Sequence, residues 1–214
     1  MQKFISMRTG RSVKEMDEAY KGEVEKSMTD LFLEEWGGRC TILDQEDGVT
    51  NTFAALRAAR GETWDLLLID YIQFGLYADS IRLDVTRAMN QAKRIATDKN
   101  GAVMVAAQLN RASLGRQDGD IRPRISELKE SGGIEEFACD IVLLHYPSRI
   151  LPGIYDPEQY QMIVGKSRYG STGEADFQFN GKLGLIRSID EMVSGELPIP
   201  SQNGVAVESS GIPA

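Results

Sequence analysis

Apolar residues recur along this chain with two spacings, one typical of amphipathic helices and the other of buried strands. Repeats of three and four residues predict helices over residues 13–36, 51–60 and 80–99. The first has an apolar stripe and is followed by two glycines that end it, and Thr50 or Asn51 can cap the second. Short apolar runs predict strands over residues 40–43, 64–70, 102–106, 140–146, 160–164 and 174–179.

The order of these elements predicts an α/β fold. The runs at 64–70 and 102–106 are apolar throughout, as in parallel strands buried on both faces. Strand–helix–strand order implies a mostly parallel twisted sheet flanked by helices. Residues 174–179 alternate polar and apolar, as an antiparallel or edge strand does. We expect one core over residues 1–187 and a flexible acidic tail over 188–214, where Ser, Gly, Pro and Glu predominate.

Composition excludes several classes of protein. The net charge of −8 argues against a protein that coats nucleic acid through bulk charge, although local loops can still bind it. No apolar run is long enough to span a bilayer, no signal peptide is recognisable, and we expect no membrane association. The two cysteines, Cys40 and Cys139, lie far apart without a histidine cluster, which favours reduced cytoplasmic thiols over a zinc site.

Two predicted strands end in polar residues that suit a nucleotide site. Asp70 follows the run at 66–69, and ligands of open α/β sheets bind at the carboxyl ends of strands. An aspartate there can hold Mg²⁺ beside phosphates, often through water. Gln108 follows the next strand, where its amide can hydrogen-bond a γ-phosphate or the attacking water. Each also has an ordinary explanation, since apolar strands commonly end in Asp and a terminal Gln can cap a turn.

Residues 115–133 form a long polar segment rich in Gly and Arg, of a length that is usually functional or disordered. Its arginines can neutralise phosphates, and its glycines allow close backbone approach. A solvated loop is the alternative. The basic residues of this region, opposed only by Asp118 and Asp120, are Arg111, Arg116, Arg122 and Arg124.

A further pair of cations follows the strand predicted at 160–164. Lys166 and Arg168 are two residues apart, so both would point to one side if the strand continued, and they could clamp a polyphosphate. The Gly-Lys-Ser here is not a phosphate-binding loop, because Tyr160 stands where that loop needs its first glycine. A solvated hairpin end is the alternative for the pair. His145 lies within an apolar run and is expected to be a core or edge residue.

Four segments together resemble consecutive motifs of DnaB-type replicative DNA helicases, in order and at similar spacing. The similarity covers about residues 3–184, and the third segment is the most specific. The segments are IDYIQ (69–73), AQLNR (107–111), RPRISELKESGGIEEFACDIVLL (122–144) and IVGKSRYGSTGEADFQFNG (163–181).

The resemblance implies a RecA-like core that works as a hexameric ring on single-stranded DNA, moving 5′ to 3′, in a bacterial or phage-infected cytoplasm. It implies ATP and Mg²⁺ between neighbouring subunits, with Asp70 as the magnesium-associated acid and Gln108 as the sensor of the γ-phosphate. Lys166 and Arg168 match the basic pair that reaches a neighbour's nucleotide, Arg168 being the finger. The DNA-binding residues implied are Arg116, Arg122, Arg124, Lys129, Glu130 and Gly132.

The chain departs from the family at three places, one of which is Glu136-Phe137, where the family has a more polar pair. The family usually has Arg where this chain has Lys129, which keeps the charge but loses the bidentate fork. No GxxxxGK[ST] sequence occurs, and the family's water-activating acid would precede Met1. Because that loop holds most of the phosphate charge, we expect these residues alone neither to bind ATP tightly nor to hydrolyse it.

Three hypotheses account for that departure. The chain can be one part of a split motor, completed by a chain that carries the phosphate-binding loop. It can be a non-catalytic module that joins or regulates a helicase ring. It can be a truncated remnant, although the motif residues Asp70, Gln108, Lys166 and Arg168 are all intact.

Overall fold

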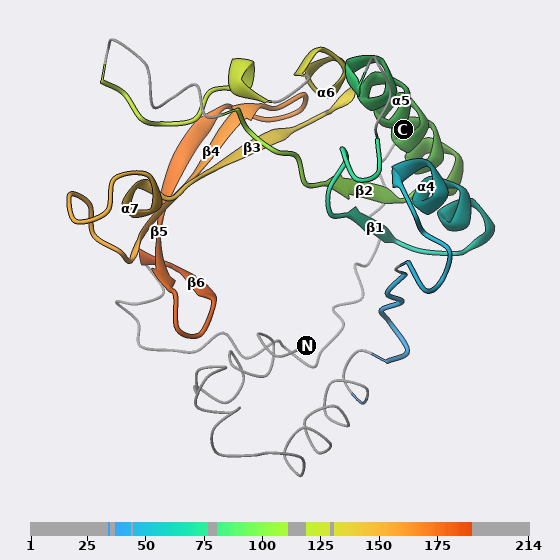
Figure 1. Ribbon diagram of the computed structural model, residues 1–214, viewed down its shortest axis with the longest axis horizontal. Coiled ribbons are helices and arrows are strands. Elements are labelled where there is room, and N and C mark those ends of the chain that lie inside the picture. The colour runs from blue at the N-terminus through green and yellow to red at the C-terminus, as the bar shows by residue number, and fades with distance from the viewer. Residues whose placement is uncertain are drawn as a thin grey trace, which may run out of the picture.

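The computed structural model describes residues 34, 37–43, 45–76, 81–110, 119–128 and 131–189 (Figure 1). The helices are α4 (Thr52–Gly61), α5 (Ile81–Lys99), the 3₁₀ turn η2 (Ile125–Glu127), α6 (Ser131–Phe137) and α7 (Pro147–Ile150). The strands are β1 (Leu66–Ile69), β2 (Ala102–Val105), β3 (Ile141–His145), β4 (Gln159–Lys166), β5 (Gly173–Asn180) and β6 (Leu185–Ser188).

The strands form two groups. β1 and β2 pair in parallel with Ile69 opposite Val105, and α5 makes the crossover between them. The other four strands form an antiparallel sheet in the order β3-β4-β5-β6. In Figure 1 α4 and α5 lie beside the parallel pair, and the antiparallel sheet extends away from them. The predicted α/β class with antiparallel C-terminal strands is confirmed, but β5 lies between β4 and β6 instead of at an edge.

Local sequence explains the two long helices. The Asn51 Oδ1 atom accepts a hydrogen bond from the Ala54 N–H at 2.9 Å, so of the two predicted caps, Thr50 and Asn51, it is Asn51 that caps α4. In α5 the predicted apolar face is the buried one, with Val85, Ala88 and Ile95 among its buried residues. Both helices therefore present one apolar face to the strands.

One hydrophobic core joins the helices to both groups of strands. Leu56 of α4, Val85 of α5 and Ile134 of α6 are buried in it together with Ile69, Ile141 and Leu143. Leu67, Val103 and Val105 pack against the same cluster. One face of β1, β2 and β3 is therefore turned toward the helices.

The opposite face of these three strands is open. We call it the open face. Its five large apolar side chains, each at least 50% exposed, are Leu66, Leu68, Met104, Val142 and Leu144. The prediction that β1 and β2 are buried on both faces is therefore wrong for this chain, because no described element packs on this side. Side chains alternate along a strand, so an apolar run necessarily places half of its residues here.

Some of the other predicted helices and strands are wrong or lie outside the described residues. The strand predicted over residues 40–43 is wrong, since this segment has no strand partner among the described residues and Ile42 is exposed. The apolar pattern does not predict β6. The helix predicted over 13–36, except for Glu34, and the tail from residue 190 lie outside the described residues. None of the described helices is both long enough and apolar enough to cross a bilayer.

Candidate nucleotide and nucleic-acid interface

The carboxyl ends of β1 and β2 bring Asp70 and Gln108 to the same edge. The Ala106 N–H donates to the Ile69 carbonyl at 2.9 Å, and the Ile72 N–H donates to the Ala106 carbonyl at 2.9 Å. These bonds extend the parallel ladder past both strand ends. Asp70 and Gln108 are exposed there, and the Asp70–Tyr71 peptide bond is cis. The structure thus places the two residues as the strand pattern predicted.

Two residues that the sequence did not single out hold this edge in place. The buried Gln73 side chain accepts a hydrogen bond from the Gln108 N–H at 3.4 Å, so it ties the segment after β1 to the segment after β2. Thr52, at the start of α4, donates from its hydroxyl to the Ile72 carbonyl at 2.8 Å and is fully buried. Gln73 is the last residue of the motif at 69–73, but no local sequence pattern indicates that its polar side chain is buried.

The single carboxylate at this edge suits a metal ion that is held mainly by the phosphates of a nucleotide. Among the described residues no group of three or more His, Cys, Asp or Glu side chains could hold an ion. Asp70 is a single exposed carboxylate at the end of a strand. Mg²⁺ in nucleotide sites is commonly bound by one or two carboxylates plus phosphate and water oxygens, so Asp70 fits that chemistry.

The segment after Gln108 is bonded to the segment that carries the predicted DNA-binding arginines. Leu109 forms an isolated antiparallel bridge with Leu128, and the Asn110 N–H donates to the Glu127 carbonyl at 2.7 Å. The Glu127 carboxylate in turn accepts from the Arg124 N–H at 3.0 Å. A continuous path of short contacts therefore runs from Gln108 to Arg124.

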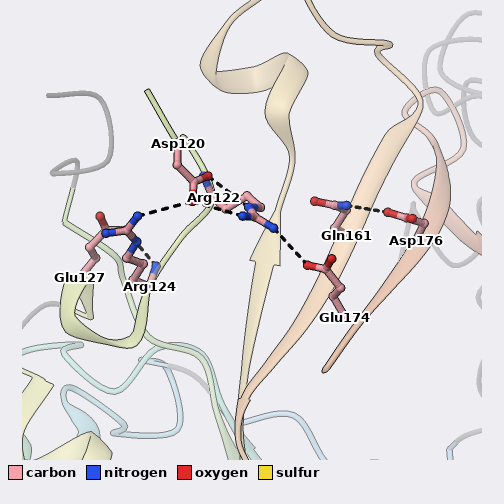
Figure 2. A network of polar contacts seen from close by, with 7 residues as sticks. All are labelled: Asp120, Arg122, Arg124, Glu127, Gln161, Glu174 and Asp176. Carbon is pink, nitrogen blue, oxygen red and sulfur yellow. Dashed lines mark hydrogen bonds and ion pairs between the residues drawn. The ribbon is translucent and has the colours of Figure 1, made fainter. Parts of the chain in front are cut away.

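The arginines at the end of this path are paired with carboxylates (Figure 2). We call Asp120, Arg122, Arg124 and Glu174 the arginine network. The Asp120 carboxylate accepts from the Arg122 backbone N–H at 3.0 Å and from its Nε at 3.1 Å. Arg124 Nη2 lies 3.5 Å from Asp120 Oδ2, and Arg122 Nη1 lies 3.5 Å from Glu174 Oε2.

This pairing changes the charge of the region. Hydrogen bonds from the Arg122 side chain and backbone hold the pKa of Asp120 well below its usual value, so Asp120 stays ionised. The same carboxylate raises the pKa of Arg122. The predicted basic loop is therefore partly neutralised from within. Arg111, Arg116, Lys129 and Glu130 lie outside the described residues.

The glycines at 132 and 133 belong to α6 and bring it close to α5. A Cβ atom on Gly133 would lie 2.5 Å from the Thr86 Cα atom, and one on Gly132 would lie 2.9 Å from Arg82 Nη2. The first contact is with backbone, so Gly133 is required by helix packing. The segment predicted as one loop over 115–133 thus contains a 3₁₀ turn and the start of a helix.

Lys166 and Arg168 have different surroundings. The Lys166 Nζ atom donates to the Glu135 carbonyl at 2.5 Å and to the Ala138 carbonyl at 2.9 Å, at the C-terminal end of α6. Arg168 is exposed, and within the described part of the chain it has no hydrogen bond or ion pair. β4 ends at Lys166, so strand alternation does not align the two side chains, contrary to the expectation from their spacing. Arg168 therefore has no partner among the described residues, whereas Lys166 already donates to two backbone carbonyls.

His145 is buried, as predicted, on β3. It is 3% exposed, and its Nδ1 atom has no hydrogen-bond partner among the described residues. Burial lowers the pKa of its imidazole, so the neutral form is favoured in the folded protein.

Comparison with known proteins agrees with the motifs. Residues 3–187 match the family described as DnaB-like helicase C terminal domain. The chain belongs to this family. It is 29% identical over 158 residues to the replicative DNA helicase DnaB of Haemophilus influenzae, covering 70% of this chain and 33% of that protein. It is 30% identical over 174 residues to the replicative DNA helicase DnaC of Bacillus subtilis, covering 75% and 34%.

Solved structures show the same fold. A DnaB-like replicative helicase, studied for its interactions with primase, superposes with a TM-score of 0.70 at 20% identity, over 87% of this chain and 46% of that one. A second solved structure, of an ATPase domain, superposes with a TM-score of 0.57 at 23% identity, over 65% and 52%. The family member described here therefore has a RecA-like ATPase fold, and it spans about a third of the length of the curated relatives that it matches.

Proposed function

We propose that this chain is the C-terminal motor part of an ATP-dependent replicative helicase that moves 5′ to 3′ on single-stranded DNA in a hexameric ring. The observation that carries the proposal is the bonded path from the Asp70–Gln108 edge to the arginine network. A motor needs its nucleotide edge and its DNA-contacting segment to be mechanically linked. Short backbone contacts between the segments after β2 and before α6 supply such a link.

At the nucleotide edge, each residue has a distinct proposed role. Asp70 holds Mg²⁺, in part through water, while Gln108 contacts the γ-phosphate or the attacking water. Arg168 reaches the nucleotide of a neighbouring subunit, which its exposed side chain, without a partner among the described residues, allows. Lys166 stabilises the C-terminal end of α6 and contributes charge beside Arg168.

We further propose that a segment with the phosphate-binding loop, from outside these 214 residues, completes the nucleotide site. The open face supports this, because exposed Leu66, Leu68 and Met104 form the kind of apolar surface that a further layer of helix would cover. Within the described residues β2 pairs only with β1 and β3 only with β4, so each also has an edge that a strand could join.

The test is ATP hydrolysis with single-stranded DNA, measured for the chain alone and mixed with a candidate chain that carries the loop. Activity is expected only for the mixture. Arg168→Ala should then lower the rate by about 10³-fold or more while nucleotide binding changes little. Arg149→Ala, at another exposed arginine on α7, is the matched control. Equal loss of nucleotide binding and hydrolysis in Arg168→Ala would refute the role in trans.

The second candidate is a non-catalytic module that enters or regulates a complete helicase ring. The exposed Arg168, which has no partner within the described part of the chain, favours it, because such a module could serve a neighbour's nucleotide without a phosphate-binding loop of its own. Adding the chain to a complete related helicase distinguishes the two. A module changes the rate of ATP hydrolysis by that helicase, whereas a split-motor part acts only together with a chain that carries the phosphate-binding loop.

A further inference from the structure

Each nitrogen of the half-exposed Arg122 guanidinium contacts a carboxylate oxygen. Nε and Nη2 lie 3.1 and 3.4 Å from the two Asp120 oxygens, a bidentate arrangement. Nη1 lies 3.5 Å from Glu174 Oε2. A phosphate that binds Nη1, the nitrogen that does not contact Asp120, therefore competes with the Glu174 carboxylate.

The two carboxylates are not equally easy to displace. Asp120 also accepts from the Arg122 backbone N–H and contacts Arg124, and its side chain is 28% exposed. Glu174 has one contact with Arg122, its side chain is 53% exposed, and it comes from β5, a distant part of the chain. Figure 2 shows Glu174 reaching Arg122 from the strand side, opposite Asp120. The weaker and more exposed partner is Glu174.

We propose that Glu174 is an exchangeable counter-ion of Arg122, which a phosphate of single-stranded DNA replaces on Nη1 while Asp120 keeps the guanidinium oriented. The proposal rests on the proposed function, in which Arg122 contacts DNA. Glu174 thereby lowers the affinity for DNA. It acts as a positioning residue for Arg122 in the free protein and contacts no DNA itself.

The exchange has a consequence for the neighbouring hairpin. Glu174 is the second residue of β5, and Gly173 beside it pairs with Val164 of β4. The turn between these strands carries Arg168. When a phosphate replaces Glu174, the Arg122–Glu174 ion pair no longer joins the arginine segment to the hairpin. The ion pair therefore connects the arginine segment to the turn with Arg168 in the free protein, and DNA binding removes this connection.

Asp176 supplies a matched control for the test. It lies two residues beyond Glu174 on the same strand, and its carboxylate accepts a hydrogen bond from Gln161 Nε2 at 2.6 Å instead of facing an arginine (Figure 2). Glu174→Gln and Asp176→Asn change the net charge equally and preserve shape. Any difference between them isolates the pairing with Arg122 from general electrostatic attraction.

The experiment measures binding of fluorescein-labelled oligothymidylate at low salt by fluorescence anisotropy. It uses the full chain together with the candidate chain that carries the phosphate-binding loop. Glu174→Gln should bind about two- to five-fold more tightly than Asp176→Asn, the range expected for an exposed ion pair. In an Arg122→Gln background this difference should vanish. Equal binding by the two variants, or a difference that persists without Arg122, would overturn the proposal.

Failure of the underlying function gives a separate result. Arg122→Gln should weaken binding and reduce the slope of log affinity against log salt by about 0.7. If Arg122→Gln binds as the unchanged protein does, or if the unchanged protein itself does not bind, the role of Arg122 as a DNA contact is refuted and both proposals fall. If it binds more weakly while Glu174→Gln and Asp176→Asn are equal, only the counter-ion proposal is wrong.

Discussion

The two sides of the strands β1, β2 and β3 have opposite surroundings. On one side Ile69, Ile141 and Leu143 are buried against α4, α5 and α6. On the other side Leu68 and Leu144, from the same apolar runs, are exposed. The residues are chemically alike, so the difference lies entirely in what packs on them.

The contrast separates the side of the strands that stabilises the folded chain from the side that, as we propose, other protein covers. The helix side supplies the core that holds Asp70, Gln73 and Gln108 in place. The open face contributes little to the folded chain alone, because its side chains remain in water. Its apolar composition is explained if further protein covers it in the assembled motor, as we propose.

The largest expected effect separates the two sides directly. Leu56→Ala, at a side chain that is 0% exposed, should lower the free energy of unfolding by about 2–5 kcal/mol through lost burial and a cavity. Leu68→Ala, at a residue 61% exposed, should change it by less than about 0.5 kcal/mol. Urea denaturation of both variants measures the two changes in the free energy of unfolding. Similar losses would show that the open face is already covered within this chain.

A smaller effect tests the packing of α6 on α5. Gly133→Ala forces a Cβ atom against the Thr86 backbone and should destabilise the protein by about 1–3 kcal/mol. Gly61→Ala, at the end of α4 with nothing within 4 Å of the added atom, is the control and should be neutral or stabilising by up to about 1 kcal/mol. Thermal or urea unfolding distinguishes them. A neutral Gly133→Ala would mean that α6 can move away from α5.

The smallest expected effect concerns His145 on β3. Its pKa is lowered by burial from the ordinary 6.5, so the unfolded chain binds the proton more readily than the folded one. Stability is then complete above about pH 6.5 and falls as the pH drops below that value toward the folded pKa. His145→Gln should remove this dependence, which urea titrations at several pH values can measure. An unchanged pH profile in the variant would assign the effect to other groups.

Much of the site could be anticipated from local sequence, and some could not. Asp70 and Gln108 each follow an apolar strand, and parallel strands bring their carboxyl ends together, so their shared edge was predictable. The hydrogen bond between Gln73 and Gln108 joins residues 35 apart, and no local pattern marks it. Lys166 donates to two carbonyls at the end of α6, 28 and 31 residues earlier, although the sequence suggested a cation that clamps a polyphosphate together with Arg168.

The sequence by itself determined the helices α4 and α5, the strands β1 to β5 and the family, because periodicity and motif order are local properties of the chain. Only the tertiary structure decided that one face of β1 and β2 stays open, that residues 40–43 form no strand, and that Arg122 is paired with Glu174. The physical reason is that burial, strand pairing and ion pairing depend on partners distant in sequence. An apolar run shows that a strand can be covered, but not whether anything covers it.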